Sequence, residues 1–127
     1  MQRLLAIVTA TLAAAVAGCG GGEGDSYSVE ATADCLRGNE LVSNVSTASD
    51  DLDVIADNAP GGGIRAEVGD ENIEVQLAFG RTDNDADTLE EGYELFDVSV
   101  TKRSNAVIAW TFDPNDEERS AVEDCLS

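Results

Sequence analysis

The residues in this sequence whose types and spacing could do chemistry are four acids at the spacing of a calcium-binding loop. Asp83, Asp85, Asp87 and Glu94 occupy positions 1, 3, 5 and 12 of a twelve-residue segment. An EF-hand loop coordinates Ca²⁺ through oxygen atoms at these positions. The sixth position holds Thr88, where an EF-hand has a glycine that permits a sharp turn. The four acids are therefore weak candidates for a cation site.

The same segment also has the periodicity of an amphipathic helix. Its apolar residues recur at intervals of three and four: Ala86, Leu89, Tyr93 and Phe96. This spacing predicts one buried face, and Thr82 or Asp83 can cap the helix N-terminus. Acids in a first turn interact favourably with the positive end of the helix dipole. We therefore favour a helix over a calcium loop. The acidic cluster at 50–57 is a similarly weak candidate for a cation site.

Other patterns that could indicate catalysis are incomplete. Ser99 and Lys102 match the Ser-x-x-Lys motif, but the companion motifs are missing and we expect a loop there. The chain contains no histidine, which removes the commonest general base and the commonest metal ligand. The sequence therefore predicts a protein that is not an enzyme and has no cofactor, and a small hydrolase is a less favoured alternative.

The N-terminus carries an export pattern. Arg3 precedes an uncharged run from Leu4 to Ala17, which is shorter than the roughly 20 residues of a membrane-spanning helix. The run ends Val16-Ala17-Gly18-Cys19. This segment resembles the lipobox of prokaryotic lipoproteins. The resemblance covers residues 1–19 and implies a signal peptide over residues 1–18, cleaved before Cys19, and a diacylglyceryl thioether on that cysteine, which would anchor the chain to the outer face of a membrane.

A glycine-rich segment over residues 19–27 is expected to tether the domain close to the membrane. Arg3 is the only charged residue among residues 1–18, so its removal would change the formal charge from −19 to −20. So acidic a chain is a poor ligand for nucleic acid, because neutralising phosphates requires basic residues. It also disfavours direct docking on anionic lipid headgroups.

Two cysteines remain for pairing once Cys19 carries lipid. An exported domain lies in an oxidising compartment, where an even pair of cysteines usually joins. We therefore predict a disulfide between Cys35 and Cys125. In the chain-entropy model, a loop on the order of 90 residues gains about 4–5 kcal/mol of stability from such a bond.

The remaining pattern predicts one small α+β domain over residues 28–127. A helix over 28–37 ends at Gly38, and a weak alternation over 41–47 indicates an edge strand. Two alternating runs from Ile64 to Phe79 predict a β-hairpin with one solvent-facing side. Residues 106–112 resemble a central strand, and Asp113-Pro114 indicates the start of a last helix.

These elements predict a two-layer sandwich with helices on one face of a mostly antiparallel sheet. The aromatic residues of its elements, Tyr93, Phe96 and Trp110, are expected in the core. The favoured function is a membrane-anchored, non-catalytic binding or interaction module with a protein, envelope or small-molecule partner. The alternative is a module whose acidic residues are ordered by calcium.

Overall fold

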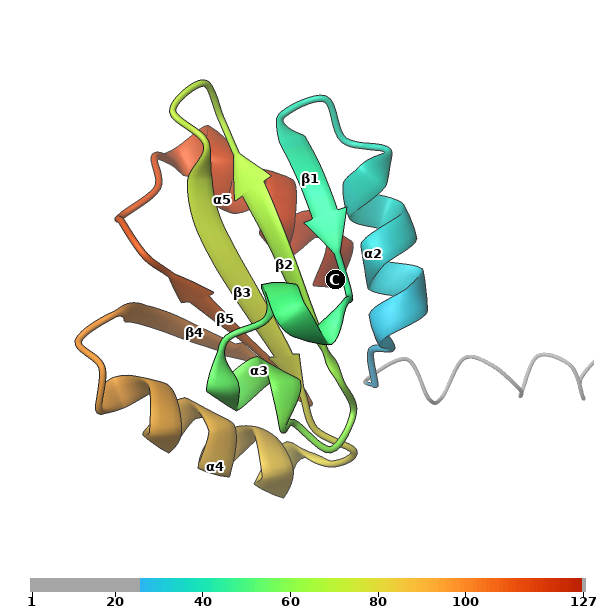
Figure 1. The fold of residues 1–127 in the computed structure, drawn as a ribbon, viewed down its shortest axis with the longest axis vertical. Coiled ribbons are helices and arrows are strands. Elements are labelled where there is room, and N and C mark those ends of the chain that lie inside the picture. The colour runs from blue at the N-terminus through green and yellow to red at the C-terminus, as the bar shows by residue number, and fades with distance from the viewer. Residues whose placement is uncertain (1–25, 127) are drawn as a thin grey trace, which may run out of the picture.

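The computed structural model describes residues 26–126, and the predictions for the signal peptide, Cys19 and most of the tether lie outside this range. The helices of the described part are α2 (Val29–Arg37), η3 (Ser49–Asp51), α3 (Val54–Asp57), α4 (Asp83–Glu94), α5 (Asp116–Glu123) and η4 (Asp124–Leu126). The strands are β1 (Val42–Ser46), β2 (Gly63–Val68), β3 (Ile73–Phe79), β4 (Ser99–Arg103) and β5 (Ala106–Trp110). The α+β class predicted from the sequence is confirmed (Figure 1).

The strands of the described part form one five-stranded sheet in the order β1-β2-β3-β5-β4. Every neighbouring pair is antiparallel. The hairpin predicted over 64–79 joins β2 to β3, and β3 pairs with β5 in a register that places Leu77 opposite Ile108. The predicted edge strand is β1, and β4 forms the other edge.

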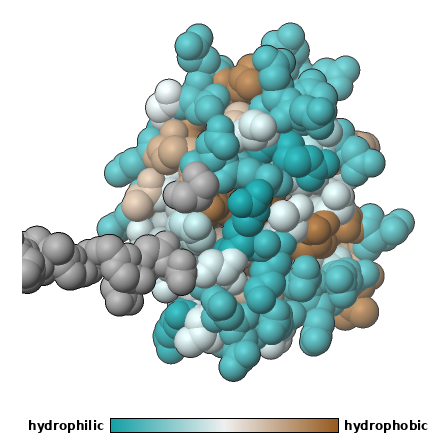
Figure 2. Space-filling view, turned by 180° about the vertical axis from the view of Figure 1, so that it is seen from behind, coloured by the Kyte–Doolittle hydropathy of each residue, from teal (hydrophilic) through white to brown (hydrophobic). Residues whose placement is uncertain are grey.

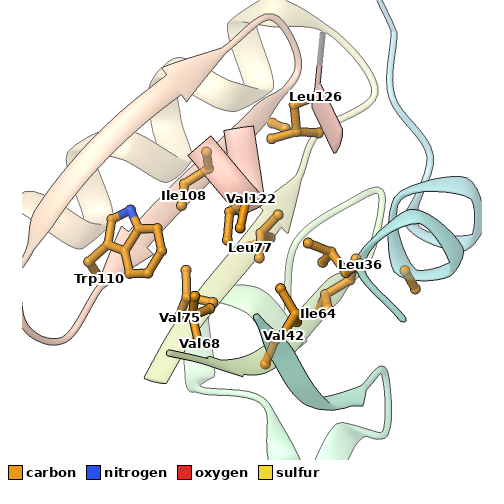
Figure 3. Close-up of a cluster of buried hydrophobic side chains, with 14 of the residues drawn as sticks. Leu36, Val42, Ile64, Val68, Val75, Leu77, Ile108, Trp110, Val122 and Leu126 are labelled. Atoms are coloured by element: carbon orange, nitrogen blue, oxygen red, sulfur yellow. The ribbon is translucent and has the colours of Figure 1, made fainter. Parts of the chain in front are cut away.

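One face of the sheet packs against α2, α5 and η4. Ile64, Val75, Leu77 and Ile108 point to this face and are fully buried against Leu36, Val122 and Leu126 from the helices. Figure 3 shows these side chains converging between the strands and the helices. Seen from behind, where α5 lies, the molecular surface is mostly hydrophilic (Figure 2).

The other face of the sheet is covered by α3 and α4, which corrects the prediction of helices on one face only. Ala56 of α3 and Ala86, Leu89 and Tyr93 of α4 pack on Ala78, Val107 and Ala109 of the sheet. Figure 1 shows α3 in front of the sheet and α5 behind it. The domain therefore has three layers, with a separate core cluster on each side of the sheet.

The misleading signal was the alternation of polar residues in the hairpin. Arg65, Glu67 and Glu74 were expected to face solvent, yet all three are half-buried. Arg65 is shared between the two acids, since its Nη2 lies 3.2 Å from Glu67 Oε2 and 3.3 Å from Glu74 Oε1. Gln76, 4% exposed, is buried beneath the helices. A polar strand face can thus be covered when its groups are partners of one another.

The predicted disulfide joins Cys35 of α2 to Cys125 of η4, with 5.7 Å between the Cα atoms. Its partners are 90 residues apart in the chain. It connects the first and last helical elements of the described domain on the same side of the sheet. The bond therefore closes a loop that includes every strand.

The helices begin where side chains satisfy free backbone N–H groups. Ser28 caps α2, so this helix begins at Val29, one residue later than predicted. Thr82 caps α4 and is one of the two caps that the sequence indicated. The last helix begins two residues later than predicted, because Asn115 is its N-cap. Asn115 and Glu118 form a reciprocal capping box, which satisfies two backbone donors and outweighs the Asp113-Pro114 signal.

Two further expectations are corrected at the end of α4. The helix ends at Glu94, so Phe96 lies beyond it and is 59% exposed rather than in the core. Residues 99–103 were expected to form a loop, but they form edge strand β4. Ser99, Val100 and Thr101 pair with β5 through Trp110, Ala109 and Ile108.

Asn105 binds the chain just before α2. Its Nδ2 donates to Tyr27 O at 3.0 Å and to Gly80 O at 2.8 Å, and its Oδ1 accepts from Tyr27 N at 2.7 Å. Asn105 is 3% exposed. Tyr27, assigned to the tether from the sequence, is therefore bound to the folded domain.

Candidate functional site

A pocket of about 210 Å³ opens between α3, the end of α4 and the sheet. Its lining residues are Asp53, Val54, Ile55, Glu74, Gln76, Tyr93, Phe96, Val98, Ala109, Trp110 and Thr111. They come from the beginning of α3, from β3, from α4 and the segment after it, and from the end of β5. The pocket thus forms only when these separate parts of the chain pack together.

Asp53 is the polar group at the α3 side of the pocket. As the N-cap of α3, its Oδ1 accepts from Ala56 N at 2.8 Å. The same oxygen accepts from Tyr93 Oη at 3.0 Å. Two donors from different helices therefore fix the orientation of this half-buried carboxylate.

Gln76 connects Asp53 to a second carboxylate. Its Oε1 accepts from Asp53 N at 3.1 Å, and its Nε2 donates to Glu74 Oε2 at 2.9 Å. Arg65 then contacts Glu74 from the neighbouring strand. This chain of hydrogen bonds fixes both polar ends of the pocket.

Tyr93 joins the polar and apolar parts of the site. Its side chain belongs to the core cluster under α4 and is 3% exposed. Burial, followed by the neighbouring charge of Asp53, raises the pKa of the Tyr93 hydroxyl far above its usual value. Tyr93 is therefore a neutral hydrogen-bond donor to Asp53 at any physiological pH.

The rest of the lining is mainly apolar. Val98 and Ala109 come from the region of the sheet, while Ile55 comes from α3. Val54 and Phe96 lie at the pocket and are 65% and 59% exposed. Exposed apolar side chains beside a concave site with a few oriented polar groups are typical of a ligand-binding site.

The four acids proposed from the sequence as calcium ligands do not converge. All lie on α4, where Asp83 and Glu94 are separated by about 16 Å along the axis. Asp85 accepts from Arg81 N at 2.9 Å, and Asp87 lies 2.8 Å from Lys102 Nζ. This hydrogen bond raises the pKa of Lys102.

The acids at 50–57 are likewise engaged in local contacts. Asp51 accepts from the Ser46 hydroxyl and Asp57 from the Ser49 hydroxyl, both at 2.6 Å. Among residues 26–126, no group of three or more Cys, Asp or Glu side chains is arranged to hold a metal ion. Ser99 and Lys102 both lie on strand β4 and bring no further catalytic motif together.

Comparisons of the chain with protein-family models, with curated proteins and with solved structures find no match. Within the described residues, no helix is both long enough and apolar enough to cross a membrane.

Sequence reasoning did not identify this pocket. Tyr93 was assigned to the core, Glu74 and Gln76 to a solvent-facing strand side, and Asp53 to a generic acidic cluster. The one available signal was Asp53 followed by Val54 and Ile55, which is a helix N-cap before apolar residues. That signal locates a short helix and does not reveal what packs against it.

Proposed function

We propose that this chain is a membrane-anchored, extracytoplasmic lipoprotein whose domain is a non-catalytic binding module. The pocket between α3, α4 and the sheet is its binding site. The observation that carries the proposal is the combination in one concavity of an oriented carboxylate, Asp53, with the exposed apolar side chains of Val54 and Phe96.

The export part of the proposal rests on two features of the chain. Residues 16–19 resemble a lipobox, and diacyl anchors hold proteins stably on membranes. The Cys35–Cys125 disulfide favours an oxidising compartment, because disulfides persist mainly outside the reducing cytosol.

The polar groups of the pocket favour binding over catalysis. The two acids of the pocket have different hydrogen-bond donors: the Asp53 carboxylate accepts from Ala56 N and Tyr93 Oη, and the Glu74 carboxylate accepts from Gln76 Nε2 and Arg65. No hydrogen bond joins the two carboxylates within the described residues, as it would in a pair that shares a proton. Tyr93 directs its hydroxyl to Asp53. These contacts hold the pocket in one shape, which lowers the entropic cost of binding.

The binding proposal is tested by a fragment screen with the isotope-labelled domain, followed by amide chemical shifts. Small aromatic compounds of positive, zero and negative charge are titrated separately. We expect at least one class to shift the amides of Asp53, Gln76 and Ala109 in a saturable manner. Absence of saturable shifts around the pocket with every class would contradict the proposed site.

Two exposed phenylalanines provide a matched pair of variants. Phe96 lines the pocket, whereas Phe112, 68% exposed, is outside its lining. Phe96→Ala should weaken fragment binding about threefold to tenfold, from the loss of roughly 1 kcal/mol of apolar contact. Phe112→Ala should leave binding unchanged, and equal effects of both changes would count against the site.

The anchor is tested separately by intact-mass spectrometry of protein isolated from membranes. We expect an N-terminal Cys19 that carries a diacylglyceryl group, and Cys19→Ala should release the chain from the membrane fraction or leave it uncleaved. An unmodified Cys19 in the native protein would refute the anchor without affecting the pocket.

A further inference from the structure

The charge distribution in the pocket indicates the class of its ligand. The lining contains two acids, Asp53 and Glu74, and no lysine or arginine. Arg65 lies against Glu74 and, because it is shared with Glu67, offsets part of that charge. Asp53 has no ion-pair partner among residues 26–126.

One oxygen of Asp53 remains available. The donors from Ala56 and Tyr93 both contact Oδ1. No other side chain or backbone group in the described part of the chain donates to Oδ2. The carboxylate is therefore held in a fixed position with one acceptor atom free, at a site whose other walls are mostly apolar.

From this arrangement we infer that the pocket binds a small organic ammonium ion, with its cationic nitrogen at Asp53 and its hydrocarbon or aromatic body against Ile55, Phe96 and Val98. This inference rests on the proposed binding function and specifies its ligand class. A charge-assisted hydrogen bond from the ammonium nitrogen to Asp53 supplies orientation. The apolar walls supply contact area for the ligand body.

Size and charge disfavour the other ligand classes. A cavity of about 150 Å³ can hold benzene, so a pocket of about 210 Å³ has room for one ring with a short substituent. A hydrated metal ion would require several oxygen ligands instead of the walls formed by Ile55, Val98 and Ala109. An anion would face Asp53 and Glu74, and the formal charge of −19 of the whole chain would repel it.

The test uses three ligands of similar shape and different charge. Phenethylammonium, 2-phenylethanol and phenylacetate are titrated into the domain at pH 7, and amide shifts of pocket residues are followed. We expect phenethylammonium to bind at least about tenfold more tightly than the alcohol, as one hydrogen bond to a charged acceptor implies. Phenylacetate should bind more weakly than both.

Asp53→Asn and Asp57→Asn provide the matched comparison. Both remove one negative charge near α3, and asparagine at position 53 can still cap the helix and accept from Tyr93. Asp53→Asn should abolish the preference for phenethylammonium over the alcohol while the alcohol still binds. Asp57, exposed and outside the lining, should be replaceable without loss of that preference.

The outcomes separate this inference from the proposed function. Equal binding of the ammonium and the alcohol by the unchanged domain would overturn the ligand class and leave the pocket as a binding site. An equal loss of preference in both variants would overturn the role of Asp53, because it would show a diffuse field effect. No binding of any of the three ligands at millimolar concentration would overturn the ligand class, and the proposed function would also fall if every other fragment failed.

Discussion

The Cys35–Cys125 disulfide provides a large and testable contribution to stability. A double replacement, Cys35→Ser with Cys125→Ser, removes the bond without leaving an unpaired thiol. The cross-linked residues are 90 positions apart, and for a loop of that size the chain-entropy model gives about 4–5 kcal/mol. Cys35 is exposed and Cys125 half-buried, so serine at either position creates little cavity and the effect reports on the cross-link.

Guanidinium unfolding followed by fluorescence is the appropriate assay. Trp110 is the only tryptophan, and it is 1% exposed, so unfolding changes its environment completely. We expect the double variant to lose about 4–5 kcal/mol of unfolding free energy and to melt more than about 15 °C lower. Its denaturant m-value should rise, because an unfolded chain without the cross-link exposes more surface.

Reduction of the unchanged domain serves as the control. Treated with excess dithiothreitol, it should match the double variant in both midpoint and m-value. A variant within about 1 kcal/mol of the oxidised domain would refute the chain-entropy reasoning. A large stability loss with an unchanged m-value would show that the bond acts mainly through the folded state.

Three further changes test other parts of the structure. Tyr93 stays protonated in the folded domain but ionises in the unfolded chain above a pH of about 10, so the domain should lose stability at alkaline pH. Tyr93→Phe should reduce the slope of unfolding free energy against pH by up to about 1.4 kcal/mol per pH unit, and equal slopes for the variant and the unchanged domain from pH 10 to 11 would contradict this. At Gly63, an added Cβ would lie 2.7 Å from Ala56 Cβ, so Gly63→Ala should lower the unfolding free energy by about 1–3 kcal/mol in thermal melting. An unchanged melting temperature would show that α3 can shift to accommodate the methyl group without cost. Asn105→Asp keeps the side-chain shape but places a carboxylate oxygen against the backbone oxygen of Tyr27, so we expect a loss of roughly 2–4 kcal/mol of unfolding free energy and faster hydrogen exchange at the Tyr27 amide. Unchanged protection of that amide would refute the role of Asn105.

Local signals in the sequence were sufficient for the hairpin, the edge strand β1, α2, α4 and the disulfide. Each of these elements was predicted from residues that are close in the chain. The disulfide was predicted because only two cysteines remain once Cys19 carries lipid. The side of the sheet covered by α4 was not predictable in this way. Arg65 and Glu74 lie at alternate positions of their strands, as residues on a solvent-exposed face do. Their partial burial depends on the ion pair between them.

Strand β4 and the pocket illustrate what local signals omit. Ser99, Val100 and Thr101 form a strand, but their position after the expected helix end and the charged pair Lys102-Arg103 favoured a loop. The pocket depends on Asp53 meeting Tyr93, which lies 40 positions away. Such a contact follows from how α3 and α4 pack on the same sheet face, and no nearby residues in the chain encode it.

The hydrogen bonds of Asn105 also set the place where the tether joins the folded domain. They fix Tyr27 beside the start of β5, whereas the pocket includes Trp110 and Thr111 at the far end of that strand. Five strand residues span about 17 Å. With the proposed lipid at Cys19, the pocket would therefore lie about one strand length from the point where the tether joins the folded domain.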